Sequence, residues 1–432
     1  MNMIAPLSPN QIAYLCKVAS SWLNVAEGGY RGGKNVMNTL AFCSALEIHP
    51  DRLHLIAGVS IATAKLNIVD CDGFGILNYF DGRCREGKFK NRDCLYVNTK
   101  IGEKIVLISG GGKRGDEKQI QGNTYGMVYI TETNQCTPEF INMAISRTLT
   151  SSDRKIFMDL NPKNPKHWFY TDILAFHTKE QEKNKNYGYN YGHFTIVDNY
   201  SLTDEQIKSI IKTYDHNSVL YKRDIKGLRM AAEGLINQEL ADHMDDYIIE
   251  KQPNNIMRIV VGVDFGGNKS QHAFVATGFT YGMRKVVPLA SKIVVAKDIN
   301  PKMLADEFCQ FIKNLYATYQ MAMQVRCDSA EQTLINGLRY EAAKQQLPVE
   351  IRNAIKSPII DRIRLVSSLV SRHKIEFYKT QTRTLQDALA TEMWDSDELD
   401  DVRLDDGSTD IDTVDAFEYT IEPDMKTLIA IN

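Results

Sequence analysis

Three features are missing from this chain of 432 residues, and each absence excludes a class of protein. No stretch approaches the roughly 18 consecutive apolar residues of a membrane span, and the start, MNMIAPLSPNQ, lacks the basic and apolar blocks of a secretory signal. We therefore expect neither membrane insertion nor secretion. The eight cysteines include no Cys-x-x-Cys pair and no Cys/His cluster with zinc spacing. This favours scattered free thiols in a reducing cytoplasm.

An excess of positive charge is missing as well. The chain carries 51 Lys and Arg against 54 Asp and Glu, a formal charge of −3. A protein that coats nucleic acid non-specifically should be basic overall, so this class is not favoured. Apolar residues make up 43% and charged residues 24%, as in an ordinary globular protein, and the length predicts two or three domains.

The first half alternates strands with helices, which predicts an α/β domain with a parallel sheet covered on both faces. Apolar residues at helical spacing predict a helix over 9–22. Short apolar runs predict strands, over 23–26, 54–59, 105–109, 126–130 and 155–160.

A polar segment separates the two halves. Residues 236–257 end in a Gln-Pro-Asn-Asn turn signal, so we expect one domain over 1–235, a linker over 236–257 and a second domain over 258–432. The second half begins with three successive strands and then alternates, with strands expected over 258–264, 272–279, 285–295 and 324–328 and a helix over 302–316.

A glycine-rich segment follows the first strand. Gly28, four further residues, Gly33 and Lys34 have the spacing of a phosphate-binding loop, in which backbone N–H groups surround phosphate oxygens and the lysine reaches the terminal phosphates. The alternative is a glycine-rich turn that caps a helix. The residue after the lysine is usually a Ser or Thr that binds Mg²⁺, but here it is Asn35. The predicted nucleotide-binding residues are Gly28, Gly29, Gly32, Gly33, Lys34 and Asn35.

Candidate partners of this loop follow later strands. The hydrophobic strand over 127–132 ends in one acid, Glu132, which could polarise the water that attacks the γ-phosphate, although the position before it, Thr131, lacks the acid that would help to hold Mg²⁺. Asn161 follows another strand and could sense the γ-phosphate; a simple Asn-Pro turn is the alternative. Arg31 and Arg114 could stabilise the transition state.

Acidic residues in the second half suggest a different chemistry. Asp264 and Asp328 each end an apolar strand, and Asp415 lies on a predicted helix. Carboxylates brought together from two strand ends and a helix can hold two Mg²⁺ or Mn²⁺ ions that cleave a phosphodiester. Asp412, three residues before Asp415, is a further candidate ligand, whereas Asp410 is expected to cap the helix. The order of strands indicates a ribonuclease H-like fold.

Charge is unevenly distributed beside these acids. Residues 351–383 hold eight Lys or Arg against two acids, and residues 395–415 hold ten acids against one base, Arg403. Each run is ordinarily a solvated face. A basic stretch beside an acidic one also suits a metal nuclease that grips a phosphate backbone. The basic run 351–383 is therefore expected to contact the DNA backbone, with Arg362 and Arg364 as the positions at which charge reversal would test this.

The ordered motifs resemble the large terminase subunits of tailed bacteriophages, of the type found in phages and defective prophages of Gram-positive bacteria. The motifs are EGGYRGGKN, IQGNTYGMVYITET, LNPKNPKHWFY, KGLRMAAEGLI, VGVDFGG, CDSAEQ and TVDAFEY, and they cover nearly the whole chain. The resemblance implies a P-loop ATPase domain followed by an RNase H-like endonuclease domain. It implies an ATP-driven motor that packages DNA into a procapsid and cuts the concatemer.

The resemblance also assigns roles and partners. Lys34 and Glu132 correspond to the phosphate-binding lysine and catalytic glutamate, Asn161 to the coupling motif, and Asp264, Asp328 and Asp415 to the nuclease acids. The implied cofactors are ATP and Mg²⁺ or Mn²⁺. The implied partners are double-stranded DNA, the portal protein, a small terminase subunit and further copies of the chain in a ring on the portal, expected to be a pentamer. The expected location is the host cytoplasm and, transiently, the procapsid portal.

Two other interpretations compete with this one. Because Asn35 and Thr131 replace both usual protein ligands of Mg²⁺, the first half could be a nucleotide-binding scaffold with little hydrolysis, leaving only nuclease activity. Alternatively, the second half could be a recombination nuclease joined to an unrelated first half. The first alternative predicts ATP binding with negligible turnover, and the second predicts that residues 1–240 bind no nucleotide.

Overall fold

The computed structural model describes residues 6–266 and 271–430. The last residue of the motif VGVDFGG, Gly267, therefore lies outside the described residues. Two compact units share the chain. The first comprises Met1–Ile207 and Lys222–Ala231, and the second Lys208–Tyr221 and Ala232–Asn432. Among the helices in the described ranges, none is long and apolar enough to cross a bilayer.

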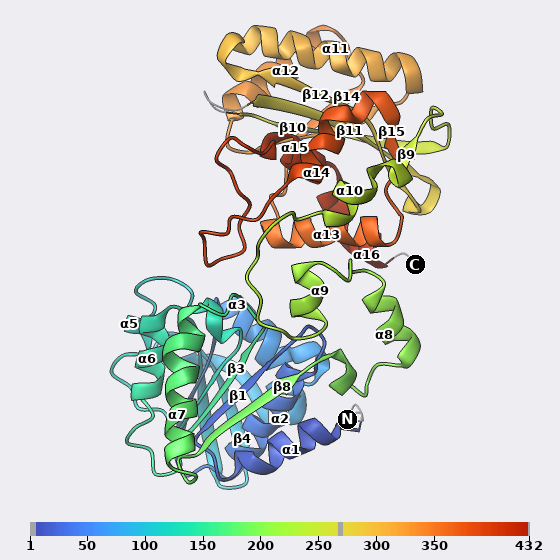
Figure 1. Cartoon of the computed structure of the whole chain (residues 1–432). Coiled ribbons are helices and arrows are strands. Elements are labelled where there is room, and N and C mark those ends of the chain that lie inside the picture. The colour runs from blue at the N-terminus through green and yellow to red at the C-terminus, as the bar shows by residue number, and fades with distance from the viewer. Residues whose placement is uncertain (1–5, 267–270, 431–432) are drawn as a thin grey trace. The chain divides into compact units, whose positions relative to one another are not determined.

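A mixed sheet of eight strands forms the centre of the first unit (Figure 1). Its order is β3-β4-β5-β2-β6-β7-β1-β8. The last six strands in this order run parallel to one another, and β3 and β4 add an antiparallel hairpin at one edge. The expected α/β class and the parallel arrangement are confirmed for six of the strands. The strands are β1 Leu23–Gly28, β2 Leu53–Gly58, β3 Cys84–Phe89, β4 Arg92–Thr99, β5 Gly102–Gly110, β6 Met127–Ile130, β7 Lys155–Leu160 and β8 Tyr189–Phe194.

Helices cover both faces of this sheet. One face packs against α1 and α2 through Tyr14, Met37 and Phe42, and the other against α6 and the turns leading to α7 through Phe140 and Phe169. Helix α1 is shorter than expected, and a reciprocal pair of hydrogen bonds between Ser8 and Gln11 caps its start. The helices in this half of the chain are α1 Pro9–Val18, α2 Lys34–Leu46, α3 Ile61–Ala64, α4 Ile76–Tyr79, α5 Glu117–Ile120, α6 Pro138–Ser146, α7 Ala175–Lys183, α8 Asp204–Ile211 and α9 Val219–Asp224; α8 and α9 lie partly in Lys208–Tyr221, which belongs to the second unit.

The second unit contains a five-stranded sheet in the order β12-β11-β10-β13-β14. The first three strands along the chain form an antiparallel meander, as expected, and β13 and β14 then join parallel to β10. The strands are β10 Ile256–Asp264, β11 Gln271–Thr280, β12 Val286–Val295, β13 Met323–Cys327 and β14 Val349–Asn353; β9 Ile248–Ile249 and β15 Phe377–Tyr378 form a separate short pair.

Helices also cover both faces of the second sheet (Figure 1). Helices α11 and α12 pack on one face through Phe308, Ile312 and Leu338, whereas α13, α14 and α15 pack on the other through Val366, Leu385 and Phe417. The helices are α10 Gln238–His243, α11 Pro301–Tyr319, α12 Gln332–Lys344, α13 Ile359–Ser371, α14 Arg383–Thr391, α15 Ile411–Ile421 and α16 Met425–Ala430.

Candidate functional site

The predicted phosphate-binding loop lies between β1 and the start of α2, as the motif requires. Lys34 is the first residue of α2 and is 6% exposed. Its Nζ donates hydrogen bonds to the carbonyl oxygens of Gly28 and Gly29, at 2.9 and 2.6 Å. Gly33 caps α2, and Gln11 Nε2 donates to the carbonyl of Gly32 at 3.2 Å. The loop therefore surrounds the lysine ammonium with its own carbonyls.

The base of the loop lies close to two neighbouring segments. A Cβ at Gly28 would lie 1.7 Å from the carbonyl oxygen of Phe194, so only glycine fits there. The backbone N–H groups of Gly29 and Tyr30 donate to the carbonyls of Phe194 and Asp224, at 3.0 and 2.7 Å. The end of β8 and the segment around Asp224 thus fix the position of the loop.

Burial changes the acidity of the loop lysine. Desolvation lowers the pKa of Lys34 to about 8, against the attraction of Asp159, Asp224, Glu27 and Glu132, which favours the charged form. An anionic group beside such a lysine stabilises its charged form, because phosphate oxygens would replace the lost hydration. The loop is therefore suited to a phosphorylated ligand.

The predicted partners of the loop occupy different surroundings. Glu132 is half-buried and has a left-handed backbone (φ 51°). Asn35 Nδ2 donates to Thr131 Oγ1 at 3.3 Å, so the two altered metal-ligand positions contact each other. Asn161 is half-buried beyond β7, and its carbonyl accepts a hydrogen bond from the Asn134 side chain at 2.8 Å.

The two candidate arginines are both exposed. Arg31 lies at the tip of the loop with a left-handed backbone, and its carbonyl accepts a 2.8 Å hydrogen bond from Asn199. Arg114 lies in the turn between β5 and α5. Arg31 belongs to the phosphate loop itself, which favours Arg31 over Arg114 as the residue that meets a bound nucleotide.

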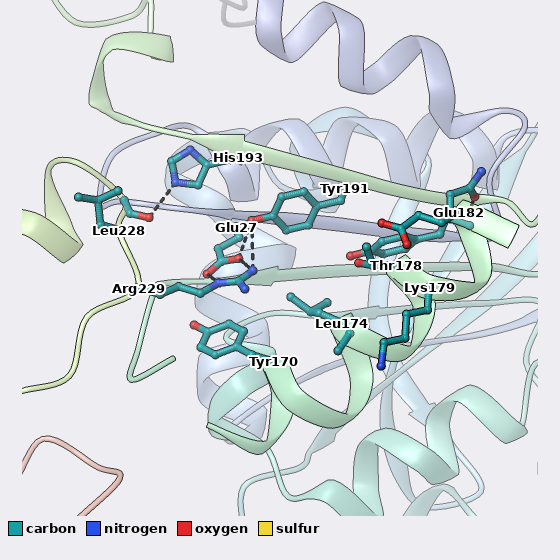
Figure 2. A pocket seen from close by; sticks show the side chains of 14 residues that line it. Glu27, Tyr170, Leu174, Thr178, Lys179, Glu182, Tyr191, His193, Leu228 and Arg229 are labelled. Carbon is teal, nitrogen blue, oxygen red and sulfur yellow. Dashed lines mark hydrogen bonds and ion pairs between the residues drawn. The ribbon is translucent and has the colours of Figure 1, made fainter. Parts of the chain in front are cut away.

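A cavity of about 950 Å³ lies beside β1 and β8, on the side of α7 (Figure 2). Glu27, the residue before Gly28, is one of the residues that line it and is fully buried. Arg229 pairs with both carboxylate oxygens of Glu27, the Nε contact being 2.8 Å, and Tyr191 donates to the same carboxylate at 2.7 Å. The Arg229 guanidinium lies 4.1 Å from the Tyr170 ring centre. An ion pair between the buried Glu27 and the half-buried Arg229 thus ties the loop's own strand to the segment Lys222–Ala231.

The predicted acids of the second unit gather around the end of β10. Asp264 is the last residue of β10 and is 8% exposed. Helix α15 approaches this strand so closely that a Cβ at Gly262 would lie 1.7 Å from the carbonyl oxygen of Ala416. This contact brings Asp412 and Asp415, both on α15, near Asp264. Asp410 caps α15 as expected, accepting a 3.1 Å hydrogen bond from the Thr413 N–H.

Each of the other three acids has a partner. Asp328 follows β13; its N–H donates to the carbonyl of Val263 at 2.9 Å, and its carboxylate pairs with Lys356. Asp415 Oδ1 accepts hydrogen bonds from Arg362 and Arg403, at 2.9 and 2.7 Å. Asp412 Oδ2 accepts from the backbone N–H of Gln271 at 2.9 Å.

The cluster of Asp264, Asp328, Asp412 and Asp415 has the electrostatics of a cation site. Burial, followed by repulsion from Asp415, Asp412 and Asp328, raises the pKa of Asp264 to about 8. A cation would relieve that repulsion, and all-oxygen ligands suit Mg²⁺ or Mn²⁺. Within residues 6–266 and 271–430, however, no three His, Cys, Asp or Glu side chains already stand in metal-binding geometry. Instead, Lys356 pairs with Asp328, and Arg362 and Arg403 donate hydrogen bonds to Asp415.

The structure corrects the expectation that Arg362 contacts DNA. Arg362 is 4% exposed, and its guanidinium pairs with Asp415 and Glu418. Arg364 is half-buried and pairs with Asp361 on its own helix. The basic run is divided by the amphipathic helix α13, which turns part of it inward, so it does not form one exposed stripe.

Sequence reasoning missed three residues of these sites. Arg403, the one base in the acidic run, is 6% exposed and pairs with Glu392, Asp415 and Glu418. Its isolation among ten acids was the available signal. Lys356, on Asp328, had no signal beyond its place in the basic run. Asp159, an acid within the buried strand β7, is 2% exposed and accepts hydrogen bonds around Thr131.

The raised pKa of Asp264 predicts a pH-dependent response to metal. The folded, metal-free protein holds a proton in this cluster up to about pH 8, whereas the unfolded carboxyl loses it near pH 4. Metal-free stability from this group is therefore complete below about pH 4 and is lost as the pH rises to about 8. Because metal competes with the proton, the melting-temperature gain from Mn²⁺ should be larger at pH 8.5 than at pH 6.

Thermal unfolding with and without Mn²⁺ at both pH values measures this effect. The Asp264→Asn variant should melt higher than the parent at pH 8.5 without metal, since it removes the repulsion, and should lose the gain from Mn²⁺. An equal Mn²⁺ gain at both pH values would contradict the assignment of the cluster as a cation site.

The sequence was compared with family models and with curated proteins. The family model described as phage terminase large subunit matches residues 89–228, which include Glu132, Asp159 and Asn161. None of the curated protein sequences matches the chain significantly.

Solved structures share the fold of nearly the whole chain. The large terminase of a thermophilic bacteriophage is 19% identical, with a TM-score of 0.77, and the match covers 96% of this chain and 99% of that one. The same phage protein in complex with ATP-γ-S matches with a TM-score of 0.75 and 19% identity, over 96% and 100% of the two chains. Its complex with ADP matches with the same score and identity, over 96% and 99%. The family model and the shared fold confirm that this chain resembles the large subunits of phage terminases, as its ordered motifs predicted.

Proposed function

We propose that this chain is the large subunit of a phage terminase, which uses ATP to drive DNA into a procapsid and cuts the DNA concatemer with a two-metal endonuclease. The proposed division is a P-loop ATPase motor over 1–235, a linker over 236–257 and an RNase H-like nuclease over 258–432. One observation carries the proposal: a single chain contains both a phosphate-binding loop around Lys34 and a cluster of four carboxylates at the end of β10.

The motor site is assigned as follows. ATP lies against the loop from Gly28 to Asn35, and Lys34 contacts its terminal phosphates. Glu132 orients the attacking water, and Arg31 offsets the charge that develops on the phosphoryl oxygens. Asn161 senses the γ-phosphate and passes closure of the site on to bound DNA. The thermophilic-phage terminase of similar fold binds ADP and ATP-γ-S, which supports nucleotide binding here.

The nuclease site uses the acidic cluster. Asp264, Asp328 and Asp415 are the proposed ligands of two Mg²⁺ or Mn²⁺ ions, and Asp412 is a fourth. Such ions activate water and stabilise the leaving oxygen of a phosphodiester. Arg362 and Arg403 orient Asp415 by holding its Oδ1, and Lys356 must leave Asp328 before that carboxylate binds metal. The strand order β12-β11-β10-β13-β14 supports an RNase H-like fold.

The proposed partners follow from the same function. They are double-stranded DNA, the portal protein, a small terminase subunit and further copies of this chain in a ring on the portal, most simply a pentamer. The proposed location is the host cytoplasm, and transiently the procapsid portal. A hydrolysis-impaired scaffold with nuclease activity alone is the second candidate, which the contact between Asn35 and Thr131 in place of the usual metal ligands favours.

Two assays on the purified chain separate these candidates. Phosphate release from ATP with Mg²⁺, with and without linear duplex DNA, tests the motor, and nicking of supercoiled plasmid in Mn²⁺ tests the nuclease. The terminase proposal predicts both activities, and the scaffold predicts ATP binding and nicking without phosphate release. A folded chain that neither binds ATP nor cuts DNA would refute both.

A further inference from the structure

A buried carboxylate lies directly behind the two positions at which the usual magnesium ligands are replaced. Asp159 is the fifth residue of β7, the strand between β6 and β1. Ile130 pairs with Met158 across β6 and β7, so Thr131 and Asp159 follow one step further on neighbouring strands. On the other side Asp159 pairs with Ala26 of β1, two residues before the loop begins. The fold thus places one acid between the loop and Glu132.

Hydrogen bonds connect this acid to the end of β6 and, through Thr131, to the first turn of α2. Thr131 Oγ1 and the backbone N–H of Glu132 donate to Asp159 Oδ1, at 3.0 and 3.2 Å. Tyr129 donates to Oδ2 at 2.7 Å. Thr131 Oγ1 in turn accepts from Asn35 Nδ2 at 3.3 Å, at the first turn of α2. A continuous chain of contacts therefore runs from Asn35 through Thr131 to Asp159 and back to Glu132.

The charge of Asp159 acts on the same site. Among the groups that favour the ammonium form of Lys34, Asp159 has the largest effect. Asp159 is fully buried, which raises its pKa, whereas its hydrogen bonds from Tyr129 and Glu132 and the nearby Lys34 favour the ionised form. A buried carboxylate that served packing alone would be costly, because an amide or an apolar side chain fills the space without desolvating a charge.

The donors at this point suit a magnesium–nucleotide complex. The Nδ2 group of Asn35 is engaged with Thr131, which leaves its Oδ1 as the oxygen that the side chain can offer to a cation. An amide oxygen is neutral, so the site needs a negative charge nearby to hold Mg²⁺ as strongly as a site with an acid at position 131.

We propose that Asp159 supplies, from the adjacent strand, the negative charge that position 131 lacks, and that it holds the Mg²⁺–nucleotide complex through Thr131 and Asn35. Asp159 is therefore a positioning residue and does not itself touch the nucleotide. The inference rests on the proposed ATPase function. It also predicts that the replacements at Asn35 and Thr131 leave a working magnesium site, against the scaffold alternative.

The test measures how much Mg²⁺ strengthens binding of ATP-γ-S, by titration in Mg²⁺ and in EDTA. In Asp159→Asn this strengthening should fall about 10- to 100-fold, the usual effect of removing a group that orients a metal ligand. Affinity in EDTA should stay near that of the parent. The double variant Thr131→Asp/Asp159→Asn moves the carboxylate back to the usual position and should regain the Mg²⁺ effect. The matched control is Asp153→Asn, because Asp153 is exposed just before β7 and its carboxylate pairs with Lys155, away from the loop.

The possible outcomes separate the two proposals. An unchanged Mg²⁺ effect in Asp159→Asn, or an equal loss of affinity in Mg²⁺ and EDTA, would overturn the role of Asp159. If Asp159→Asn does not fold, the double variant decides, since it keeps one carboxylate: a parent-like Mg²⁺ effect supports the proposal and its absence overturns it. A parent that binds ATP-γ-S without any Mg²⁺ effect overturns the role of Asp159 alone. A parent that binds no ATP-γ-S at all refutes the proposed ATPase.

Discussion

Replacement of Asp328 by asparagine should abolish the nicking of supercoiled plasmid in Mn²⁺. Asp328 follows β13 beside the end of β10, and its side chain is 13% exposed, at the rim of the acidic cluster. Asparagine keeps the shape of the side chain but removes the charge that would hold a metal ion. We expect the rate to fall by at least about 10²-fold, the usual cost of losing one group that stabilises developing charge.

The fold should tolerate this change. The backbone N–H of Asp328 keeps its bond to Val263, and Lys356, the partner of the carboxylate, is partly exposed and can be hydrated. The matched control is Asp306→Asn, on the exposed face of α11, where the carboxylate pairs with Lys302. It should cut like the parent. Cutting by Asp328→Asn at the parental rate would place the nuclease site elsewhere, and no cutting by the folded parent would overturn an intrinsically active nuclease.

Much of the sheet architecture was predictable because most of the central strands are short segments of mainly apolar residues. Strands β1, β2, β6 and β7 are almost entirely buried, and their short sequences do not have the apolar spacing of a helix. The hairpin of β3 and β4 was missed because its turn residues, Lys90 and Asn91, both have a left-handed backbone without a glycine to mark them. The edge strand β8, YNYGHF, was missed because it is polar and lines a cavity.

The site residues that lie at the end or the start of a strand or helix were predictable from the sequence. Lys34 begins the helix after β1, Glu132 follows β6 and Asp264 ends β10, so pattern alone indicated them. Asp159 and Arg403 could not be found in this way, because their roles depend on partners brought close by the fold. Asp159 contacts a residue 28 positions earlier, and Arg403 reaches Glu418 across the turn before α15.

The error at Arg362 has a related cause. Counting charges along 351–383 treated every base as exposed, but α13 buries one face. Arg362 lies on that face and compensates Asp415 and Glu418, whose charges would otherwise be buried without a partner. Composition indicates how many charges a segment has, whereas the periodicity of the helix decides which of them reach solvent.

Replacement of Lys34 by alanine should abolish ATP hydrolysis while leaving plasmid nicking intact. In the structure the ammonium is held by the carbonyls of Gly28 and Gly29, and we propose that it exchanges them for terminal phosphates when ATP binds. Alanine cannot supply this charge, so the hydrolysis rate should fall by at least about 10²-fold. The melting temperature should change little, because two lost hydrogen bonds are offset by removing an ammonium whose burial lowers its pKa to about 8.

Both activities should be measured on the same protein preparation, as phosphate release in Mg²⁺ and plasmid nicking in Mn²⁺. The control is Lys17→Ala, because Lys17 is an exposed lysine near the end of α1 and should behave like the parent in both assays. Loss of hydrolysis with nicking preserved would show that the two chemistries use separate sites in one chain. Retained hydrolysis in Lys34→Ala would refute the phosphate-binding loop. Loss of both activities at an unchanged melting temperature would mean that cutting depends on the nucleotide site, a coupling that separate sites do not predict.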